Sequence, residues 1–291
     1  MSRFFHADLH SHSTFSDGTL SPTALAARAQ SQGVTLWALT DHDEIGGLAQ
    51  AQAAAHAHGM DFLTGVEISV SFAGSTVHIV GLGFDANNAQ LLQGLHHIRH
   101  SRGPRAQEMG RQLASAGIPH AYEGALQYVG NPELISRTHF ARYLVEIGVC
   151  KNTYDVFKRY LVEGKPGYVP QRWASLKEAV HWITQAQGVA VIAHPARYNF
   201  SPSEEYAFFT SFQSYGGEAV EVVTGSHTVH EYARYAALAK DLGLHISRGS
   251  DFHCPQESKI DLGSLPSDPS GLPGVWELLQ SRIQKAPLQS A

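Results

Sequence analysis

The chain has 291 residues, 43% of them hydrophobic, which allows one large α/β domain with an insertion or two ordinary domains. Its net charge is −5 and its pI is about 6.4, so no overall positive field attracts DNA or an anionic membrane. Two cysteines, Cys150 and Cys254, are too few for a disulfide framework and lack metal-ligand spacing. With no apolar signal segment at its start and no long apolar run, the protein is expected to be cytoplasmic, and any anionic ligand must be met by local cations.

Short apolar runs alternate with helical stretches along most of the chain. Seven segments predict strands, namely residues 5–10, 35–40, 60–69, 76–84, 189–194, 219–223 and 244–247. The first predicted helix has Ser21 as its N-cap, Pro22 in its first turn and Gly33 at its end. Further helices are predicted over residues 46–59, 175–188 and about 230–240, the second of these beginning with Ser175 and Glu178 in capping-box register.

The order of these segments predicts an α/β barrel. Helical connections between most of the strands favour a parallel sheet, and seven repeats without a dinucleotide-type glycine loop favour a barrel over an open sheet. Residues 88–167 interrupt the repeat with three predicted helices, over 91–102, 104–116 and 138–145. We therefore expect a discontinuous seven-stranded barrel over residues 1–87 and 168–291, with a helical subdomain inserted over the C-terminal face of the barrel.

Imidazole and carboxyl side chains cluster where the predicted strands end. His10 and His12 end the first strand two residues apart, so both rings lie on one face of an extended segment, and Asp251 and His253 repeat this spacing at the last strand. The intervening strand ends carry Asp17, His42, Glu67, His78 and His194. Because the C-terminal ends of the strands of a parallel barrel surround one pocket, the sequence predicts that these nine residues form a single site.

Six imidazoles and three carboxylates suit Mn²⁺, Fe²⁺ or Zn²⁺ better than Ca²⁺ or Mg²⁺, which favour oxygen ligands. Nine groups exceed the needs of one ion, so they predict two or three ions, with Glu67 as the candidate bridging ligand. Taken alone, each histidine is more often a packing or surface residue, and Asp17 before Gly18 is more often a turn residue. Their coincidence at strand ends favours the metal site.

Six segments, DLHSHSTFSDG, TDHD, GVEIS, HIVGLG, AHP and GSDFH, resemble in this order the polymerase-and-histidinol-phosphatase (PHP) family of the amidohydrolase superfamily. NPELISRTHFARYLV and GKPGYV narrow the resemblance to nucleotide phosphatases of that family, some of which trim the 5′ ends of short RNAs. The resemblance implies a distorted seven-stranded barrel with a trinuclear manganese centre. In it, the ligand sets would be His10, His12, Glu67 and Asp251 for one ion, Glu67, His78 and His194 for a second, and Asp17, His42 and His253 for a third.

The resemblance also implies an activity, the hydrolysis of the 3′-phosphate of nucleoside 3′,5′-bisphosphates by a hydroxide that bridges two ions, for example from adenosine 3′,5′-bisphosphate to AMP. Asp8 is expected to orient a metal ligand. A phosphate clamp in the insertion is expected from Arg102, Arg105, Arg137, Thr138 and His139, with Lys165 as a weaker candidate. The proton for the leaving group could come from Asp41, His139 or His227, and the sequence does not choose among them.

Three alternatives to this activity stay open at the level of sequence. One is a histidinol-phosphate phosphatase that uses the same ions on another leaving group, which the arginine-bearing insertion disfavours. Another is a 5′-to-3′ exonuclease on short 5′-phosphorylated RNA. The third is a non-catalytic metal-binding module, which nine intact candidate ligands disfavour. For the favoured activity the expected partner is a small phosphorylated nucleotide, or a short RNA, with no DNA and no membrane.

Overall fold

The computed structural model describes residues 6–171, 173–268 and 270–287. The chain divides into two compact units, one formed by Met1–Leu95 with Trp173–Ala291 and the other by His96–Arg172. The second unit begins later than the expected insertion at residue 88 because helix α3 (Ala89–Ser115) starts on the first unit, where Gly94 lies directly against the Trp182 ring. The units are described separately below.

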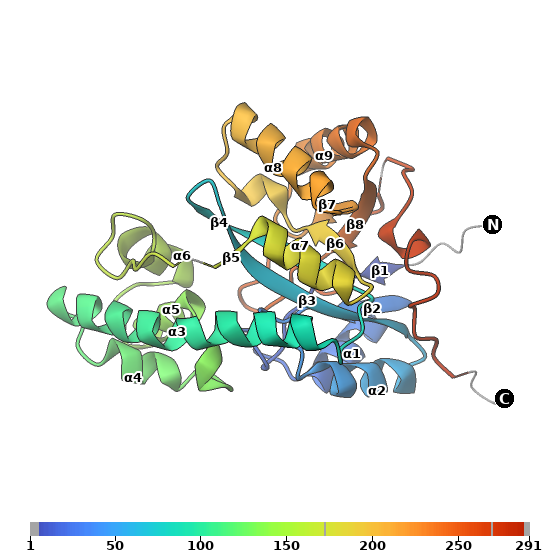
Figure 1. Ribbon diagram of the computed structural model, residues 1–291. Helices are drawn as coiled ribbons and strands as arrows, with labels where there is room; N and C mark the ends of the chain where they lie inside the picture. The colour runs from blue at the N-terminus through green and yellow to red at the C-terminus, as the bar shows by residue number, and fades with distance from the viewer. Residues whose placement is uncertain (1–5, 172, 269, 288–291) are drawn as a thin grey trace. The chain divides into compact units, whose positions relative to one another are not determined.

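The first unit is the nearly closed seven-stranded barrel that the sequence predicts (Figure 1). Its strands, in hydrogen-bonded order, are β1 (Ala7–Asp8), β2 (Leu36–Leu39), β3 (Asp61–Phe72), β4 (Ser75–Leu82), β6 (Val189–Ile192), β7 (Ala219–Thr224) and β8 (His245–Gly249). Backbone bonds from Leu9 N–H to the Arg248 carbonyl, at 3.0 Å, and from Asp251 N–H to the His10 carbonyl, at 2.8 Å, join the first strand to the last. A short strand, β5 (Ala174–Ser175), pairs with β3 outside this ring. Phe5, expected in the first strand, lies outside the described residues.

One strand runs against the expected parallel direction. β4 is antiparallel to both of its neighbours, β3 and β6. The cause is local, because β3 and β4 are joined by Ala73 and Gly74 alone, which have φ values of 47° and 77°. Two residues with positive φ are typical of a tight hairpin turn, and a parallel crossover needs about a dozen residues or more.

Helices connect the other strands of the barrel, as the sequence predicts. They are α1 (Pro22–Ser31), α2 (Leu48–Ala57), α7 (Leu176–Gln185), α8 (Pro202–Ser214) and α9 (Val229–Leu242), with short 3₁₀ turns at Pro195–Arg197 and Val275–Glu277. Ser21 caps α1, and Ser175 and Glu178 form the expected capping box of α7. The sequence analysis did not name α8, although Ser201, Pro202 and Glu204 carry the same start signal.

The barrel interior changes from apolar to polar along single strand faces. On β3 the inward face carries Leu63 in the core and then Glu67, and on β4 it carries Leu82 and Val80 in the core and then His78. Because side chains alternate between the two faces of a strand, residues at even spacing share one face. The apolar end of the interior therefore supports a polar end built on the same strands.

The second unit is helical. It contains the rest of α3, α4 (Ala121–Leu126), α5 (Arg137–Glu146), α6 (Thr153–Val156), a 3₁₀ turn at Pro132–Leu134 and a π-helical turn at Phe157–Leu161, around a core that includes Met109, Leu113, Phe140 and Leu144. The two helices predicted on either side of Gly103 are one continuous α3, with Pro104 in its interior. Proline removes one hydrogen bond there, and packing of the following turns into this core offsets that loss. Among the described residues, no helix is long and apolar enough to cross a membrane.

Barrel closure depends on a close approach between β8 and the residue after β1. A Cβ atom at Gly249 would lie 2.2 Å from His10 Cβ and 2.6 Å from His10 N. We expect Gly249→Ala to lower the free energy of unfolding by about 1 to 3 kcal/mol, measured by urea denaturation, because overpacking must push the two segments apart. Gly103→Ala, where an added Cβ meets nothing within 4 Å, should keep or raise stability. Equal unfolding midpoints for Gly249→Ala and the unmodified protein would contradict this account of closure.

Candidate metal centre

The nine predicted ligands all belong to the first unit, and the barrel brings them together at the polar end of its interior. Most follow the C-terminal ends of parallel strands, while Glu67 lies on β3 and His78 on the antiparallel β4. His78 pairs with Ser69 and so lies in the first half of β4, which is the half at the same end of the barrel. The reversed strand direction therefore leaves His78 at the centre.

The first group is His10, His12, Glu67 and Asp251, whose candidate ligand atoms all lie within 4.8 Å of one another. His10 Nε2 is 3.3 Å from Glu67 Oε2, and His12 Nε2 is 3.2 Å from Asp251 Oδ1. Two ligands of a tetrahedral ion bound at about 2.1 Å lie about 3.4 Å apart. The spacing of this group therefore suits a common ion.

The second group surrounds the other oxygen of Glu67. His78 Nδ1 is 2.8 Å and His194 Nε2 is 2.9 Å from Glu67 Oε1, and the two ring nitrogens are 3.4 Å apart. His42 also approaches, with Nδ1 3.0 Å from Glu67 Oε2. Glu67 thus offers one oxygen to each of two groups, which is the geometry that a bridging carboxylate requires.

The third group contains Asp17, His42 and His253 and, beyond the predicted set, His12. His253 Nε2 is 3.3 Å and His42 Nε2 is 3.9 Å from Asp17 Oδ1. His12 and His253 stack with their ring centroids 4.0 Å apart. The residues that the resemblance assigned to three ions therefore lie in three neighbouring groups, in which His12, His42 and Glu67 are each shared by two groups and His194 joins through its contact with Glu67.

The donor set fits metal ions on two further counts. Glu67 Oε2 and Asp251 Oδ1 are buried and accept no hydrogen bond from any described residue. Burial alone would raise the pKa of Glu67, yet the imidazoles of His78, His42 and His10 hold it well below its usual range. Burial lowers the pKa of His78 to about 4, so that ring is neutral, which is the form of imidazole that binds metals. At His10, His42 and His253 burial would lower the pKa, yet the nearby carboxylates raise it, so an ion bound there must displace a proton. The cluster thus combines ionised carboxylates with imidazoles and is suited to hold metal ions.

Sequence reasoning missed three residues that contact the cluster. Glu221 on β7 lies 2.7 Å from His10 Nδ1, and the Tyr198 hydroxyl accepts a 2.8 Å hydrogen bond from His78 N–H. The Arg197 guanidinium lies 2.7 Å from Asp251 Oδ2, and its side chain is 49% exposed. Two signals were available in the sequence, an acidic residue inside the apolar run AVEVV and an arginine three residues after His194.

Asp8 was expected to orient a metal ligand, and its carboxylate contacts chiefly backbone groups. It accepts hydrogen bonds from Ser250 N–H at 2.9 Å and Gly263 N–H at 2.7 Å and, at the longer distance of 3.5 Å, from the backbone N–H of the predicted ligand His10. The carboxylate that contacts the His10 ring is Glu221. Asp8 is buried at the junction of β1 and β8, so it stabilises the backbone that carries the ligands.

Of the three candidate proton donors, two belong to the first unit and are engaged. Asp41 accepts from Ser13 N–H at 2.7 Å and from the hydroxyls of Ser13 at 2.6 Å and Ser16 at 2.5 Å. His227 Nδ1 lies 3.0 Å from the Val222 carbonyl, and its Nε2 accepts from the backbone N–H of Ala196 at 3.2 Å. Asp41 therefore anchors the loop that follows His12, and His227 is held by the backbone on both sides of its ring. Their roles as acids stay predictions.

The third candidate, His139, and the predicted clamp belong to the second unit. Ser136 N–H donates to His139 Nδ1 at 3.0 Å, which closes the capping box at the start of α5 next to Thr138. Arg105 Nε donates to the Val169 carbonyl at 2.9 Å. Burial, followed by the positive charges of Arg137 and Arg102, lowers the pKa of Arg105. Arg102 and Arg137 are thus each close enough to Arg105 to repel it.

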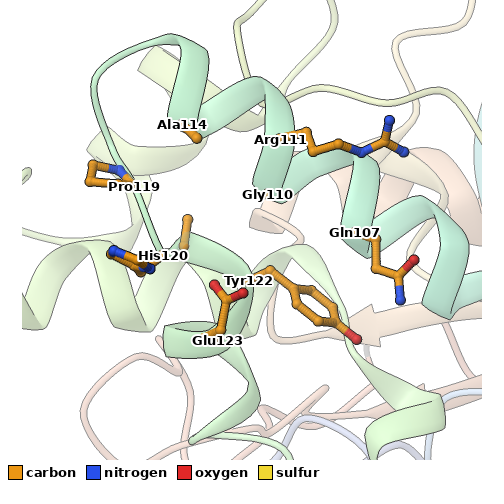
Figure 2. Close-up of a pocket in the computed structure, with 9 residues that line it drawn as sticks. Gln107, Gly110, Arg111, Ala114, Pro119, His120, Tyr122 and Glu123 are labelled. Atoms are coloured by element: carbon orange, nitrogen blue, oxygen red, sulfur yellow. The ribbon is translucent and has the colours of Figure 1, made fainter.

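A pocket of about 540 Å³ opens on the second unit between α3 and the start of α4 (Figure 2). Its charged side chains are mixed in sign, and Arg111 pairs with Glu108 at 2.7 Å. None of the nine predicted metal ligands lines it; the lining residues are Gln107, Gly110, Arg111, Ala114, Pro119, His120, Ala121, Tyr122 and Glu123. We assign no chemistry to this pocket.

A seven-stranded α/β barrel with clustered imidazole and carboxylate ligands at one end defines a metal-binding barrel of the hydrolase type. The PHP domain pattern matches residues 8–188, and the chain belongs to the PHP family. It is 48% identical to a 3′,5′-nucleoside bisphosphate phosphatase from Chromobacterium violaceum over 95% of this chain and 97% of that protein. It is 43% identical to a 5′-3′ exoribonuclease from Haemophilus influenzae over 93% of this chain and 97% of the relative.

A solved structure shows the same fold. An amidohydrolase from Chromobacterium violaceum, with bound sulfate and no metal, superposes with a TM-score of 0.94 at 47% identity and covers 97% of this chain and 99% of its own. The predicted family and fold class are confirmed by these similarities.

The contacts of Asp41 lead to a prediction that separates anchoring from acid chemistry. Asp41→Ala leaves three donors at Ser13 and Ser16 without their acceptor, so we expect it to lower the free energy of unfolding by about 2 to 4 kcal/mol in urea denaturation. Asp41→Asn should lower it by less than half as much, because an amide oxygen still accepts from Ser13 N–H and a serine hydroxyl can accept from the amide. Equal stability of Asp41→Ala and the unmodified protein would remove the anchoring role.

Proposed function

We propose that this chain is a metal-dependent phosphatase that hydrolyses the 3′-phosphate of nucleoside 3′,5′-bisphosphates. One observation carries the proposal, the convergence of nine imidazole and carboxylate groups, Glu67 among them, in a chain that is 48% identical, over nearly its whole length, to a phosphatase of that name. A cytoplasmic location and the absence of DNA and membrane partners stay predictions.

The three ligand groups would hold two or three Mn²⁺ ions, with Fe²⁺ and Zn²⁺ as alternatives. Such ions supply neutralisation of phosphoryl oxygens and activation of water. The protein contributes the shared ligand, because Glu67 presents one oxygen to His78 and His194 and the other to His10 and His12. Asp41 keeps the loop after His12 in place through its contacts to Ser13 and Ser16.

Binding of the substrate requires cations, since a phosphate monoester is dianionic and the chain carries a net charge of −5. Arg197 is the cation that contacts a candidate ligand directly, and its half-exposed guanidinium has donors beyond the one that Asp251 accepts. We assign Arg197 to the phosphoryl group under attack. The cluster of Arg102, Arg105 and Arg137 in the second unit is assigned to the second phosphate.

Protonation of the leaving oxygen is assigned to His139. Ser136 N–H donates to its Nδ1, so the neutral ring carries its proton on Nε2. By contrast, the Nδ1–H group of His227 donates a hydrogen bond to the Val222 carbonyl, and the Asp41 carboxylate accepts hydrogen bonds from three donors. Among the three candidates, His139 therefore has the ring state that a proton donor needs.

A 5′-to-3′ exonuclease is the second candidate, because a relative of that name is 43% identical over 93% of this chain. Both candidates recognise a 5′-phosphate on a nucleotide, and they differ in whether the attacked phosphorus is a monoester or a diester. Rates on the two substrate classes distinguish them.

A phosphate-release screen tests the proposed function. We expect Mn²⁺-loaded protein to convert adenosine 3′,5′-bisphosphate to AMP and phosphate with a higher kcat/KM than it shows for histidinol phosphate or for a 5′-phosphorylated RNA oligomer. His194→Ala should abolish turnover, because it removes a ligand 2.9 Å from Glu67, while Asp61→Asn, at the other end of β3, should retain it. A higher kcat/KM for release of mononucleotides from the oligomer would favour the exonuclease, and activity that survives exhaustive chelation would overturn both.

Two arginine variants test how the phosphates are assigned. Arg197→Ala should lower kcat about 100-fold, because a positioned donor at the reacting group is lost. Arg137→Ala should raise KM for the bisphosphate by about 10- to 100-fold, as expected for one charge-assisted hydrogen bond, and should leave KM for 3′-AMP unchanged. Steady-state kinetics on both substrates measure these effects. An equal change in KM for both substrates in Arg137→Ala would contradict the assignment of Arg137 to the second phosphate.

A further inference from the structure

Glu221 on β7 contacts two predicted ligands that belong to different groups. Its side chain is 1% exposed, and Oε1 lies 2.7 Å from His10 Nδ1. Its other oxygen, Oε2, accepts a hydrogen bond from the backbone N–H of His194 at 2.7 Å. No predicted ligand set includes Glu221, although it touches one member of the first group and one of the second.

The contact with His10 determines which ring nitrogen is offered to the centre. An ionised carboxylate only accepts hydrogen bonds, so His10 donates from Nδ1. Nε2 then faces the other groups, at 3.3 Å from Glu67 Oε2, 3.4 Å from Asp251 Oδ1 and 3.1 Å from His12 Nε2. A hydrogen bond at one ring nitrogen sets the tautomer and the direction of the nitrogen that binds a metal.

The contact with His194 supports a strained backbone. His194 has φ 25° and ψ 59°, and it precedes Pro195, where the preceding residue normally takes an extended conformation. Backbone outside the common regions persists only when the surroundings hold it. The hydrogen bond from His194 N–H to Glu221 Oε2 is a buried contact that does so, and in this conformation His194 Nε2 lies 2.9 Å from Glu67 Oε1.

We infer that Glu221 is a positioning residue that presents His10 to one ion and His194 to another, so that a single buried carboxylate couples the two ion positions. This inference rests on the proposed function, because it requires that the two groups hold ions. Glu221 need not touch substrate, and its effect passes through the two histidines.

Glutamine cannot reproduce this role. Its amide has one oxygen that accepts and one nitrogen that donates, whereas both partners of Glu221 donate. With the amide oxygen toward His194 N–H, the amide nitrogen donates to His10 Nδ1 and forces the ring proton onto Nε2, where it blocks the metal. With the amide turned over, the N–H groups of His194 and the amide oppose each other. Either way one ligand is lost.

Calorimetric titration of the metal-free protein with Mn²⁺ tests the inference, together with urea denaturation of each metal-free variant. Glu221→Gln should weaken the tightest Mn²⁺ binding by about 10- to 100-fold, the range observed when the hydrogen-bond partner of a ligand is removed. The number of Mn²⁺ ions bound per chain should also fall in Glu221→Gln. Glu221→Asp keeps the charge and both acceptors on a shorter side chain, so it should weaken binding less than Glu221→Gln does.

Asp61→Asn is the matched control for loss of a buried carboxylate. Asp61 accepts from Ala286 N–H at 3.0 Å and from Lys285 Nζ at 2.9 Å, and it lies at the start of β3, at the end of that strand away from Glu67. We expect it to lower stability without changing Mn²⁺ affinity. A purely structural role for Glu221 predicts the same pattern for Glu221→Gln, namely lower stability with normal Mn²⁺ binding.

The outcomes separate the inference from the proposed function. If the unmodified protein binds no Mn²⁺, Fe²⁺ or Zn²⁺, the proposed function fails. If it binds ions and Glu221→Gln binds them equally well, the function stands and the positioning role is wrong. Should Glu221→Gln fail to fold, Glu221→Asp decides the matter, and Mn²⁺ affinity equal to that of the unmodified protein in that variant overturns the inference.

Discussion

The buried carboxylate of Glu67 is the constraint on which the centre depends. Moving an isolated carboxylate out of water is strongly unfavourable unless positive charge or hydrogen-bond donors surround it. Glu67 is fully buried, and five imidazoles contact its two oxygens at 2.8 to 3.3 Å. These imidazoles lie on or just after four strands, β1, β2, β4 and β6, so these four and β3, which carries Glu67, must all be placed correctly for the contacts to form. The same contacts of Glu67 therefore determine both the stability of this end of the barrel and its ability to hold ions.

The antiparallel strand shows how tightly register is specified. His78 shares the inward face of β4 with Val80 and Leu82, and Ser69 opposite it shares the inward face of β3 with Glu67. A slip of one residue would turn His78 outward and Val77 and Ile79 inward, because side chains alternate along a strand. The apolar core thus fixes the register of the two strands, and the register then aims the ligand. Whether the side chain of His78 faces the barrel interior depends on its position in the alternation along β4 and not on the direction in which the strand runs.

The sequence predicted the parts of the site that follow strand periodicity and missed the parts that depend on long-range hydrogen bonds. The nine predicted ligands, the seven strands and the capping box of α7 carry local patterns, and the structure places these nine residues close together. Glu221 has no such pattern, since its partner His10 is 211 residues away in the sequence. Asp8 was predicted in its place, as the carboxylate that orients a ligand, only because it shares a strand face with His10. The break expected at Pro104 was wrong because packing of α3 outweighs one lost hydrogen bond. Helix propensity describes the local sequence only, so it cannot include the stabilisation that α3 gains from packing against other helices.

The chain is negative overall but carries arginines at particular places, so an anionic ligand is repelled by the whole chain and attracted at those places. The net charge of −5 disfavours a dianionic ligand at long range, and screening confines that effect to roughly 8 to 10 Å at ordinary ionic strength. Within that distance, local cations decide. In the second unit, burial and then the positive charges of Arg137 and Arg102 lower the pKa of Arg105, so these two arginines repel it. Arg197 has the opposite environment: its side chain is half-exposed, and the partial loss of water around it is outweighed by the negative charges of Asp251 and Glu67, which raise its pKa. The first unit therefore places one cation beside carboxylates, and the second unit places a separate group of cations near one another, so each unit carries a local positive site on a chain whose net charge is negative.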